Sequence, residues 1–518
     1  MPLPRLIYKA TYTLAGGNVK SCQYLNAVLF SLTALLALLT TIRLRGHASY
    51  ADALIPLLLV GPSHWESLTM GFLIQFTSGL FLNFVLLTLM ATFQSSVIRW
   101  TRLGAVFATT LLVGMCGSNS LTFMVSGSLW LAWIALTHWR ISRAKSLVAG
   151  CLSVASMSAF IAIFKSLPSV NHVPATIPEL FKKSLQFFSL ALGHAGKNFG
   201  EFKPGYPVMG LILGVLFLAI CMWCVWQLRH LRLSGRSSIA AAMICYAAGM
   251  GMLIAGITYG RAGAIPSFYI FNRYATLASP VVVLIFLGMI TILPDRFRPF
   301  WSVALLIIVT LVAWPNWVDG KSQAKNLSDS LKEVEDDLKE GMPIPFLSDR
   351  YWFHVYFPGP KYMQEFLNEY TKIPTSIFYG AKPTLDVSYS PLNYQLISRD
   401  QTICRAHEVE LMDWDGSFEM KLFDSPRPVY AVEMTYTLSH PSIGYVKNKI
   451  TTWPHAVEHH QKPIINQLQH TNQMETTKIY FDRSFDRIRF DISFAKGTTL
   501  TIHSLREISL RAESAPRP

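Results

Sequence analysis

Two arginines and a tyrosine, Arg261, Arg273 and Tyr274, lie in the stretch GRAGAIPSFYIFNRYATLASP (residues 260–280) between two long apolar runs. The stretch contains no acidic residue. An arginine presents a planar fork of donors that can bind two phosphate oxygens at once. A fixed cation at the edge of an apolar region calls for an anion or a polar partner. These residues therefore either bind a phosphate group, or anchor helix ends through anionic lipid headgroups and free backbone carbonyls.

Acidic residues are scarce in the first 318 residues, which hold 22 Lys and Arg but only five acids: Asp52, Glu66, Glu179, Glu201 and Asp295. A carboxylate can serve as general base for an acceptor hydroxyl. Asp52 and Glu66 have the strongest claim, because they bracket an apolar piece broken by proline, and such pieces often line cavities. Asp52 fits equally well as the N-cap of a helix that starts at Ala53. A divalent metal is compatible with this chemistry, but His64 and Glu66 alone do not define a metal site, and no cofactor is identified.

The elements that position these residues are predicted to be membrane helices. Charge-free runs occupy residues 21–42, 67–98, 103–139, 146–164, 204–228, 237–260, 274–294 and 299–318. Each approaches the roughly 20 apolar residues that a helix needs to cross a bilayer. The run 103–139 is broken at Gly117-Ser118-Asn119-Ser120 and predicts a helical hairpin. The sequence thus predicts a polytopic α-helical membrane domain of about nine helices over residues 1–318.

Basic residues gather in four short loops, at 99–102, 140–145, 229–236 and 295–298. On a count of nine spans these loops share one side, which the positive-inside rule makes cytoplasmic. The loop 165–203, the arginine stretch and everything after residue 318 then face the other side. The apolar run from Ala53 to Gly61 leaves two alternatives open. It is re-entrant or interfacial, or it crosses with help from neighbours, which would put residues 1–20 outside and make Arg43 and Arg45 cytoplasmic.

The C-terminal 200 residues have a different composition, with 23 basic and 26 acidic residues. Residues 319–383 predict a helical linker or subdomain, with helices over 321–341 and 361–370. Residues 384–518 alternate apolar and polar positions with period two at 428–439, 476–484, 486–494 and 499–511. This pattern predicts a jelly-roll-like β-sandwich outside the cytoplasm. Trp414, Tyr445 and Trp453 are candidate glycan-stacking residues, or alternatively members of the core or the sheet edge.

Several segments together resemble the GT-C glycosyltransferases and related bacterial polytopic membrane proteins. They are PRLIY near the start, SYADALIPLLLVGPSHWESLTMGF (49–72), the GR…FNRY stretch and GMPIPFLSDRYWF (341–353). The resemblance lies in the order and spacing of the segments. It implies sugar transfer from a polyprenyl-phosphate donor at the extracytoplasmic face of the bacterial inner membrane. Arg261, Arg273 and Tyr274 would then hold the lipid phosphate.

The same resemblance implies a catalytic acid in the first extracytoplasmic loop, after the first membrane helix. This chain has no Asp or Glu before Asp52, and MPLPRLIYK resembles the end of that loop. We therefore expect either that the first helix and its acidic loop are missing from this sequence, or that the standard base has been lost.

Three classes of function follow. The first is a glycosyltransferase that uses a lipid-phosphate donor to modify a cell-surface glycan. The second is a non-catalytic membrane-anchored protein that binds a glycan or a partner. The third is a transporter, disfavoured because the spans carry no charge and show no internal repeat. Nucleic-acid binding is excluded as an explanation of the net charge of +14, because the excess positive charge belongs to the membrane half.

Overall fold

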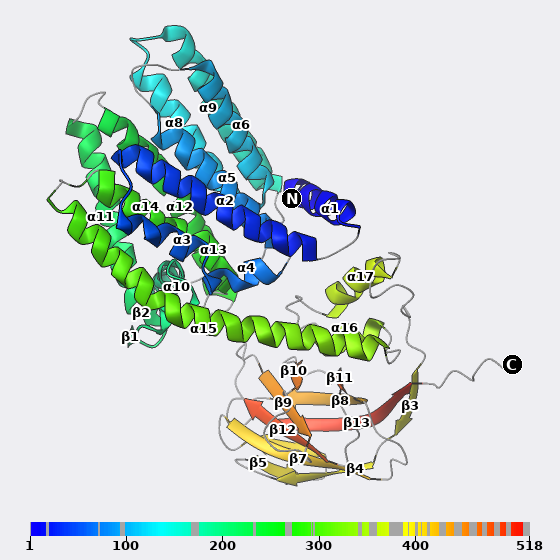
Figure 1. The fold of residues 1–518 in the computed structure, drawn as a ribbon. Coiled ribbons are helices and arrows are strands. Elements are labelled where there is room, and N and C mark those ends of the chain that lie inside the picture. The colour runs from blue at the N-terminus through cyan, green and yellow to red at the C-terminus, as the bar shows by residue number, and fades with distance from the viewer. Residues whose placement is uncertain are drawn as a thin grey trace. The chain divides into compact units, whose positions relative to one another are not determined.

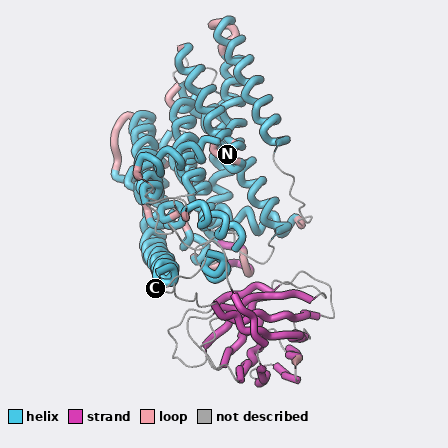
Figure 2. Tube along the Cα trace, turned by 90° about the vertical axis from the view of Figure 1, so that its right-hand side faces the viewer, coloured by secondary structure: helices cyan, strands magenta, loops and turns pink. Residues whose placement is uncertain are grey.

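The computed structural model describes residues 2–16, 20–70, 73–93, 99–166, 176–230, 235–264, 272–291, 293, 296–339, 344–351, 360–371, 387–391, 393–398, 402–405, 407–411, 415–423, 431–439, 448–454, 464–468, 474–480, 487–493 and 499–510. The chain divides into two compact units, residues 1–326 and 327–518. The first unit is built almost entirely of helices and the second contains the larger sheets (Figures 1 and 2).

Seven helices within the described residues are long and apolar enough to cross a membrane. They are α2 (Lys20–Arg45), α5 (Ile74–Ala91), α7 with α8 (Ser118–Leu121 and Phe123–Thr137), α9 (Arg143–Ser166), α11 (Val208–His230), α12 (Gly235–Ala264) and α15 (Arg298–Lys339). Two shorter apolar stretches complete the predicted set of helices: α6 (Trp100–Met115), and α13 with α14 (Ala275–Ala278 and Pro280–Thr291). The predicted membrane-type helical domain is confirmed by length and composition, and the hairpin break does fall at Gly117.

Residues 50–70, here called the return segment, form a broken run of short helices beside α2. The run consists of η1 (Tyr50–Ala53), α3 (Leu54–Leu59), η2 (Pro62–His64) and α4 (Trp65–Thr69). At its start, Asp52 is ion-paired with Arg45 in the last turn of α2. At its end, the carbonyls of Ser67 and Met70 accept hydrogen bonds from Asn26 Nδ2 at 2.8 and 3.3 Å. Asn26 and Arg45 are about 29 Å apart along a helix that rises 1.5 Å per residue. The return segment therefore runs back along most of the length of α2.

The direction of α5 supports the same conclusion. The Thr77 hydroxyl donates to Asn26 Oδ1 at 2.7 Å, and the Thr40 and Thr88 hydroxyls lie 2.8 Å apart. The N-terminal part of α5 thus contacts the N-terminal part of α2, and their C-terminal parts contact each other, so the two helices are parallel. Parallel neighbours need a connection that crosses back, and the return segment supplies it. Residues 50–70 therefore run antiparallel to α2 and connect it to a parallel neighbour.

The first unit has two chemically different ends. At the basic end, Arg43 of α2 and Arg99 lie close enough to Arg102 to interact electrostatically, and Arg102 Nη1 donates to the Thr92 carbonyl at 3.1 Å. The other end, called the loop end, gathers α4, α13, the turn η5 (Asn272–Tyr274), the helix α10 (Ile177–Leu190) and the turn η4 (His194–Asn198), which contact one another. A short hairpin, β1 (Glu201–Lys203) and β2 (Tyr206–Pro207), and the N-terminal helix α1 (Pro2–Leu14) complete this unit.

The second unit contains two antiparallel sheets and two helices, α16 (Ile344–Tyr351) and α17 (Pro360–Tyr370). Five strands pair in the order β10-β9-β12-β7-β4, and six form the other sheet in the order β11-β8-β13-β6-β5, with β3 against β13. The strands are β3 (Val387–Pro391), β4 (Asn393–Ser398), β5 (Thr402–Arg405), β6 (Glu408–Leu411), β7 (Asp415–Phe423), β8 (Ala431–Ser439), β9 (Asn448–Pro454), β10 (Ile464–Leu468), β11 (Met474–Tyr480), β12 (Arg487–Ser493) and β13 (Thr499–Leu510).

The four strands predicted from period-two alternation correspond to β8, β11, β12 and β13. In β8, Val432, Met434 and Tyr436 are buried while the residues between them are partly exposed. The linker prediction needs a correction. The predicted helix over 321–341 is not a separate element, since α15 continues without interruption from the last apolar run to Lys339. Pro315 lies inside this helix and does not end it.

Candidate functional site

The arginine stretch is held together by one aromatic side chain. Arg261 lies in the last turn of α12, and its Nη2 donates to the Tyr274 hydroxyl at 2.7 Å. The Arg261 guanidinium also lies 5.5 Å from the centre of the Tyr274 ring, within the range of a cation–π interaction. Tyr274 is buried and follows the half-buried Arg273 in η5. Tyr274 thereby joins Arg261 to the turn that carries Arg273.

A buried lysine joins this group from a different part of the chain. Lys183 is 1% exposed and lies on α10, which packs against α12, α13 and η5. The helix begins with a capping box, in which the Thr176 backbone N–H donates to Glu179 Oε2 at 2.9 Å. Burial, followed by the neighbouring Lys182, lowers the pKa of Lys183 to about 8; Glu179 opposes this and Arg261 adds to it. Lys183 and Arg261 therefore share one electrostatic environment at the loop end.

Glu66 belongs to the same end, because its helix, α4, is hydrogen-bonded to α13, which follows Arg273 in the chain. The hydroxyls of Ser67 and Thr276 lie 2.9 Å apart, and Thr276 Oγ1 is 3.3 Å from His64 Nδ1. The other ring nitrogen, His64 Nε2, lies 2.9 Å from the Leu58 carbonyl. Glu66 itself is half-buried. The return segment thus places the helix that bears Glu66 against the turn that carries Arg273 and Tyr274.

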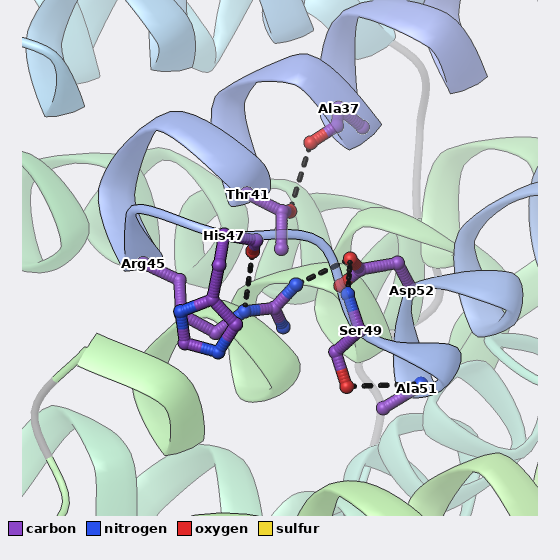
Figure 3. A network of polar contacts seen from close by, with 7 residues as sticks. All are labelled: Ala37, Thr41, Arg45, His47, Ser49, Ala51 and Asp52. Carbon is purple, nitrogen blue, oxygen red and sulfur yellow. Dashed lines mark hydrogen bonds and ion pairs between the residues drawn. The ribbon is translucent and has the colours of Figure 1, made fainter.

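Asp52 lies at the opposite end of the unit. Figure 3 shows its carboxylate facing the guanidinium of Arg45, and its Oδ2 also accepts the Ser49 backbone N–H at 2.8 Å. The prediction that Asp52 is an N-cap is wrong: Ser49 is the N-cap of η1, and Asp52, three residues later, completes the capping box by accepting the Ser49 N–H. The structure separates Asp52 from Glu66 by the length of α2, and they do not form one site.

A further acid of the loop end, Asp319, comes directly after the last apolar run. Asp319 Oδ2 lies 3.3 Å from His194 Nε2, which opens η4. Asn316, one turn earlier on α15, holds η4 in place: its Nδ2 donates to the Leu192 carbonyl at 2.7 Å and its Oδ1 accepts the Ala195 N–H at 2.8 Å. The result is a histidine–carboxylate pair at the loop end.

A close approach connects this pair with the return segment. Gly193 adopts φ +92°, and a Cβ there would lie 2.5 Å from both Asn316 Nδ2 and Ser63 Cβ. Only glycine suits this position, for both its backbone angle and its space. Ser63 precedes His64, so η4, α15 and the return segment meet at one point.

The other acids of the predicted extracytoplasmic loop have structural partners. Glu179 closes the capping box of α10, and Glu201 Oε2 accepts the Gly205 N–H at 2.8 Å in the β1–β2 turn. No group of three or more His, Cys, Asp or Glu that could hold a metal occurs among the described residues. Of the predicted glycan-stacking residues, Trp414 and Tyr445 lie outside the described residues. Trp453 lies in β9, opposite Arg489 of β12.

Two residues of this end were missed by sequence reasoning. Lys183 lies on the amphipathic helix α10 directly after Lys182. The ammonium groups of Lys182 and Lys203 lie over the Tyr206 ring, whereas Lys183 is buried, and nothing in the local sequence distinguishes the two adjacent lysines. Asp319 was assigned to the soluble half because the charge-free run ends at residue 318. The signal that could have found it is the polar residue Asn316 within the last apolar run.

Comparisons with known proteins give no relative: no family model and no curated protein matches this chain.

Proposed function

We propose that the loop end binds the phosphate of a polyprenyl-phosphate carrier, and that the chain transfers a sugar from it to a glycan at the extracytoplasmic face of the bacterial inner membrane. One observation carries the proposal. Arg261 donates to the Tyr274 hydroxyl, and Arg273 precedes Tyr274 in η5. The buried Lys183 lies on α10, which packs against α12 and η5, and the helix that bears Glu66 packs against η5 as well. A phosphate is the anion whose geometry suits two arginine forks, and its lipid tail suits a site at the ends of apolar helices.

The distribution of charge supports this orientation. Arg43, Arg99, Arg102, Arg140, Arg143 and Lys145 all belong to the basic end or to its connections, and the positive-inside rule makes that end cytoplasmic. The loop end is then extracytoplasmic. With the return segment as an additional crossing, the N-terminal helix α1 and the second unit emerge on this same outer side.

The tryptophans of α15 support the proposed position of the site at the outer membrane interface. Trp301 is 41% exposed near the start of the helix, and the exposed Trp314 and Trp317 rings stack at 5.5 Å near the other end of its apolar part. Trp301 and Trp317 are about 24 Å apart at 1.5 Å per residue, which approaches the thickness of a bilayer core. Tryptophans favour membrane interfaces, so Asp319 falls at the outer interface.

The chemistry of transfer assigns a role to each group. A carboxylate accepts the proton of the acceptor hydroxyl as its oxygen bonds to the anomeric carbon of the sugar. The bond between that carbon and the carrier phosphate breaks, and the phosphate leaves with one additional negative charge. Arg261, Arg273 and Tyr274 stabilise this charge as it develops. Glu66 is the first candidate for the base, and the His194–Asp319 pair is the second.

The second unit is proposed to be a jelly-roll-like β-sandwich that contacts the glycan. Its two sheets are antiparallel throughout their described pairings, and sequence neighbours such as β7 and β8 fall in different sheets. Trp453, whose backbone pairs in β9, is proposed to stack on a sugar ring. A fully non-catalytic glycan-binding protein remains the alternative if the loop end binds a carrier without turnover.

Transport is a second candidate, favoured by one observation. The return segment is a discontinuous crossing, and it carries the buried polar residues Ser63, His64 and Ser67. Broken helices with polar interiors line substrate paths in many transporters.

Photolabelling tests the proposal. A polyprenyl phosphate with a photoreactive group close to its phosphate should label the purified protein on peptides around residues 261–274 and 183. Excess undecaprenyl phosphate should suppress the labelling. Labelling spread evenly over the lipid-facing helices would contradict a carrier site at the loop end.

A further inference from the structure

One face of the helix α1 packs against the first unit. Pro4 is buried, and Tyr8 and Tyr12 are partly buried, with their rings stacked at 6.3 Å between centres. The carbonyl of Tyr8 accepts a hydrogen bond from Cys22 Sγ, in the first turn of α2, at 3.9 Å. The helix also contacts α5 and α6. Because the start of α2 belongs to the loop end, α1 is held at that end as well.

The remaining surface of α1 is exposed and divides into an apolar row and a basic row. Leu6, Ala10 and Leu14 are exposed at a spacing of four residues, Leu6 by 67% and Leu14 by 88%. Arg5 and Lys9 are exposed one position earlier, at the same spacing. Residues four apart lie on one face of a helix, so the two rows run side by side along α1. Residues 1–51 contain no acidic residue, and the basic row gives this surface a net positive charge.

The start of α2 shows where the membrane surface lies relative to α1. Only residues 15–19 separate the two helices. Lys20 begins α2 and Tyr24 follows one turn later, and lysine and tyrosine at the end of an apolar helix are typical of a membrane interface. Exposed apolar side chains then recur every three or four residues along α2, as on a face turned to lipid: Tyr24, Val28, Leu32, Leu35 and Leu39. The helix α1 is therefore attached to the unit at the level of the lipid headgroups.

We propose that α1 is an interfacial helix that binds an anionic lipid surface at the loop end. Its apolar row enters the boundary between headgroups and acyl chains, and Arg5 and Lys9 bind negatively charged headgroups of the same leaflet. A lipid leaflet presents an apolar layer and an anionic layer one above the other, which matches two rows side by side on one helix. The proposal is independent of sugar transfer, since it requires only the membrane domain.

Depth measurements test the membrane contact. The purified full-length protein, in a background without the exposed and partly exposed cysteines Cys151, Cys221 and Cys404, carries a nitroxide label at Ala10→Cys or at Lys9→Cys. In nanodiscs of phosphatidylcholine and phosphatidylglycerol, the label at position 10 should collide more with oxygen, which partitions into lipid, than with a water-soluble nickel chelate. The label at position 9 should show the opposite preference. Greater access of the nickel chelate at both positions overturns the proposal. Little access of either reagent also overturns it, because a second copy or a partner protein would then cover α1.

A lipid titration in detergent tests the preference for anionic headgroups. The probe is phosphatidylglycerol, with phosphatidylcholine as the neutral comparison. The readout is the mobility of the label at Ala10→Cys, which reports on α1 and not on the arginine stretch. In this labelled protein, Arg5→Gln and Lys9→Gln should each raise the half-saturating concentration of phosphatidylglycerol by about fivefold, and the effect should decrease at high salt.

The matched control is Lys332→Gln, which removes an exposed cation from the polar part of α15 and should leave the half-saturating concentration unchanged. Phosphatidylcholine should produce no saturable change in mobility. Equal half-saturating concentrations for the labelled parent, Arg5→Gln and Lys9→Gln overturn the assignment of headgroup contacts to the basic row.

Discussion

Asn26 Nδ2 donates a hydrogen bond of 2.8 Å to the carbonyl of Ser67, which ties the N-terminal part of α2 to the far end of the return segment. This contact places the end of the return segment beside the start of α2. Because α5 then runs parallel to α2, the start of α2 and Arg261 belong to the same end of the first unit.

Cysteine labelling in intact cells should show this topology. Cysteines introduced for Lys9 in α1 and for Ile450 in β9 should react with a membrane-impermeant maleimide added outside, and one for Arg140 should not. The background should carry Cys404→Ser, because Cys404 is partly exposed. Labelling of the Lys9 position only after the cells are opened would show that the return segment does not cross.

The substitution Asn26→Leu should destabilise the protein. Asn26 is fully buried, donates to the Ser67 and Met70 carbonyls, and accepts the Thr77 hydroxyl. Leucine leaves these groups unpaired, which costs about 1–3 kcal/mol for each buried group that finds no new partner. Thermal unfolding in detergent should show a clearly lowered midpoint, while the exposed Ser31→Ala on the same helix should not. A midpoint equal to that of Ser31→Ala would mean that α2 does not depend on this bond.

The substitution Asp52→Asn should lower stability, whereas Glu66→Gln should lower sugar transfer. Asp52→Asn leaves the partly buried Arg45 without its carboxylate and should cost about 1–3 kcal/mol of stability, with carrier affinity unchanged for the folded fraction. Glu66→Gln should lower sugar transfer, with little loss of stability or carrier affinity. Reduced transfer in His194→Gln and Asp319→Asn, with Glu66→Gln fully active, would move the base to the histidine–carboxylate pair.

The buried Lys183 should make the stability of the folded protein depend on pH. Its pKa is lowered from the ordinary value of 10.5 to about 8 in the folded protein, so the unfolded state binds more protons between these values. Stability attributable to this residue should therefore rise with pH across that window, by on the order of 2 kcal/mol. The contribution of Lys183 is obtained by comparing the free energies of unfolding of the wild type and Lys183→Met at pH 8 and at pH 10. A difference that does not change with pH would show that Lys183 is hydrated in the folded state.

The sequence predicted the helical membrane domain, the hairpin break and four strands of the second unit (β8, β11, β12 and β13), because hydropathy and period-two alternation are local properties. It could not predict how Asp52 and Glu66 divide between the two ends, since this depends on the side-chain bonds of Asn26. Lys183 was missed for a similar reason: tertiary packing of α10 under α12 buries it. The continuity of α15 past Pro315 also has no local signal, because proline ordinarily interrupts a helix.

The central claim is that the loop end is a carrier-phosphate site, and a binding titration tests it most directly. Purified wild-type protein should bind undecaprenyl phosphate, and Arg273→Ala should weaken binding by about tenfold to a hundredfold, as expected for loss of a charged hydrogen bond. Lys203→Ala, which removes an exposed cation from the same end, serves as the control and should bind like the wild type. Equal affinities for wild type and Arg273→Ala would contradict the claim and reduce the arginines to anchors of helix ends.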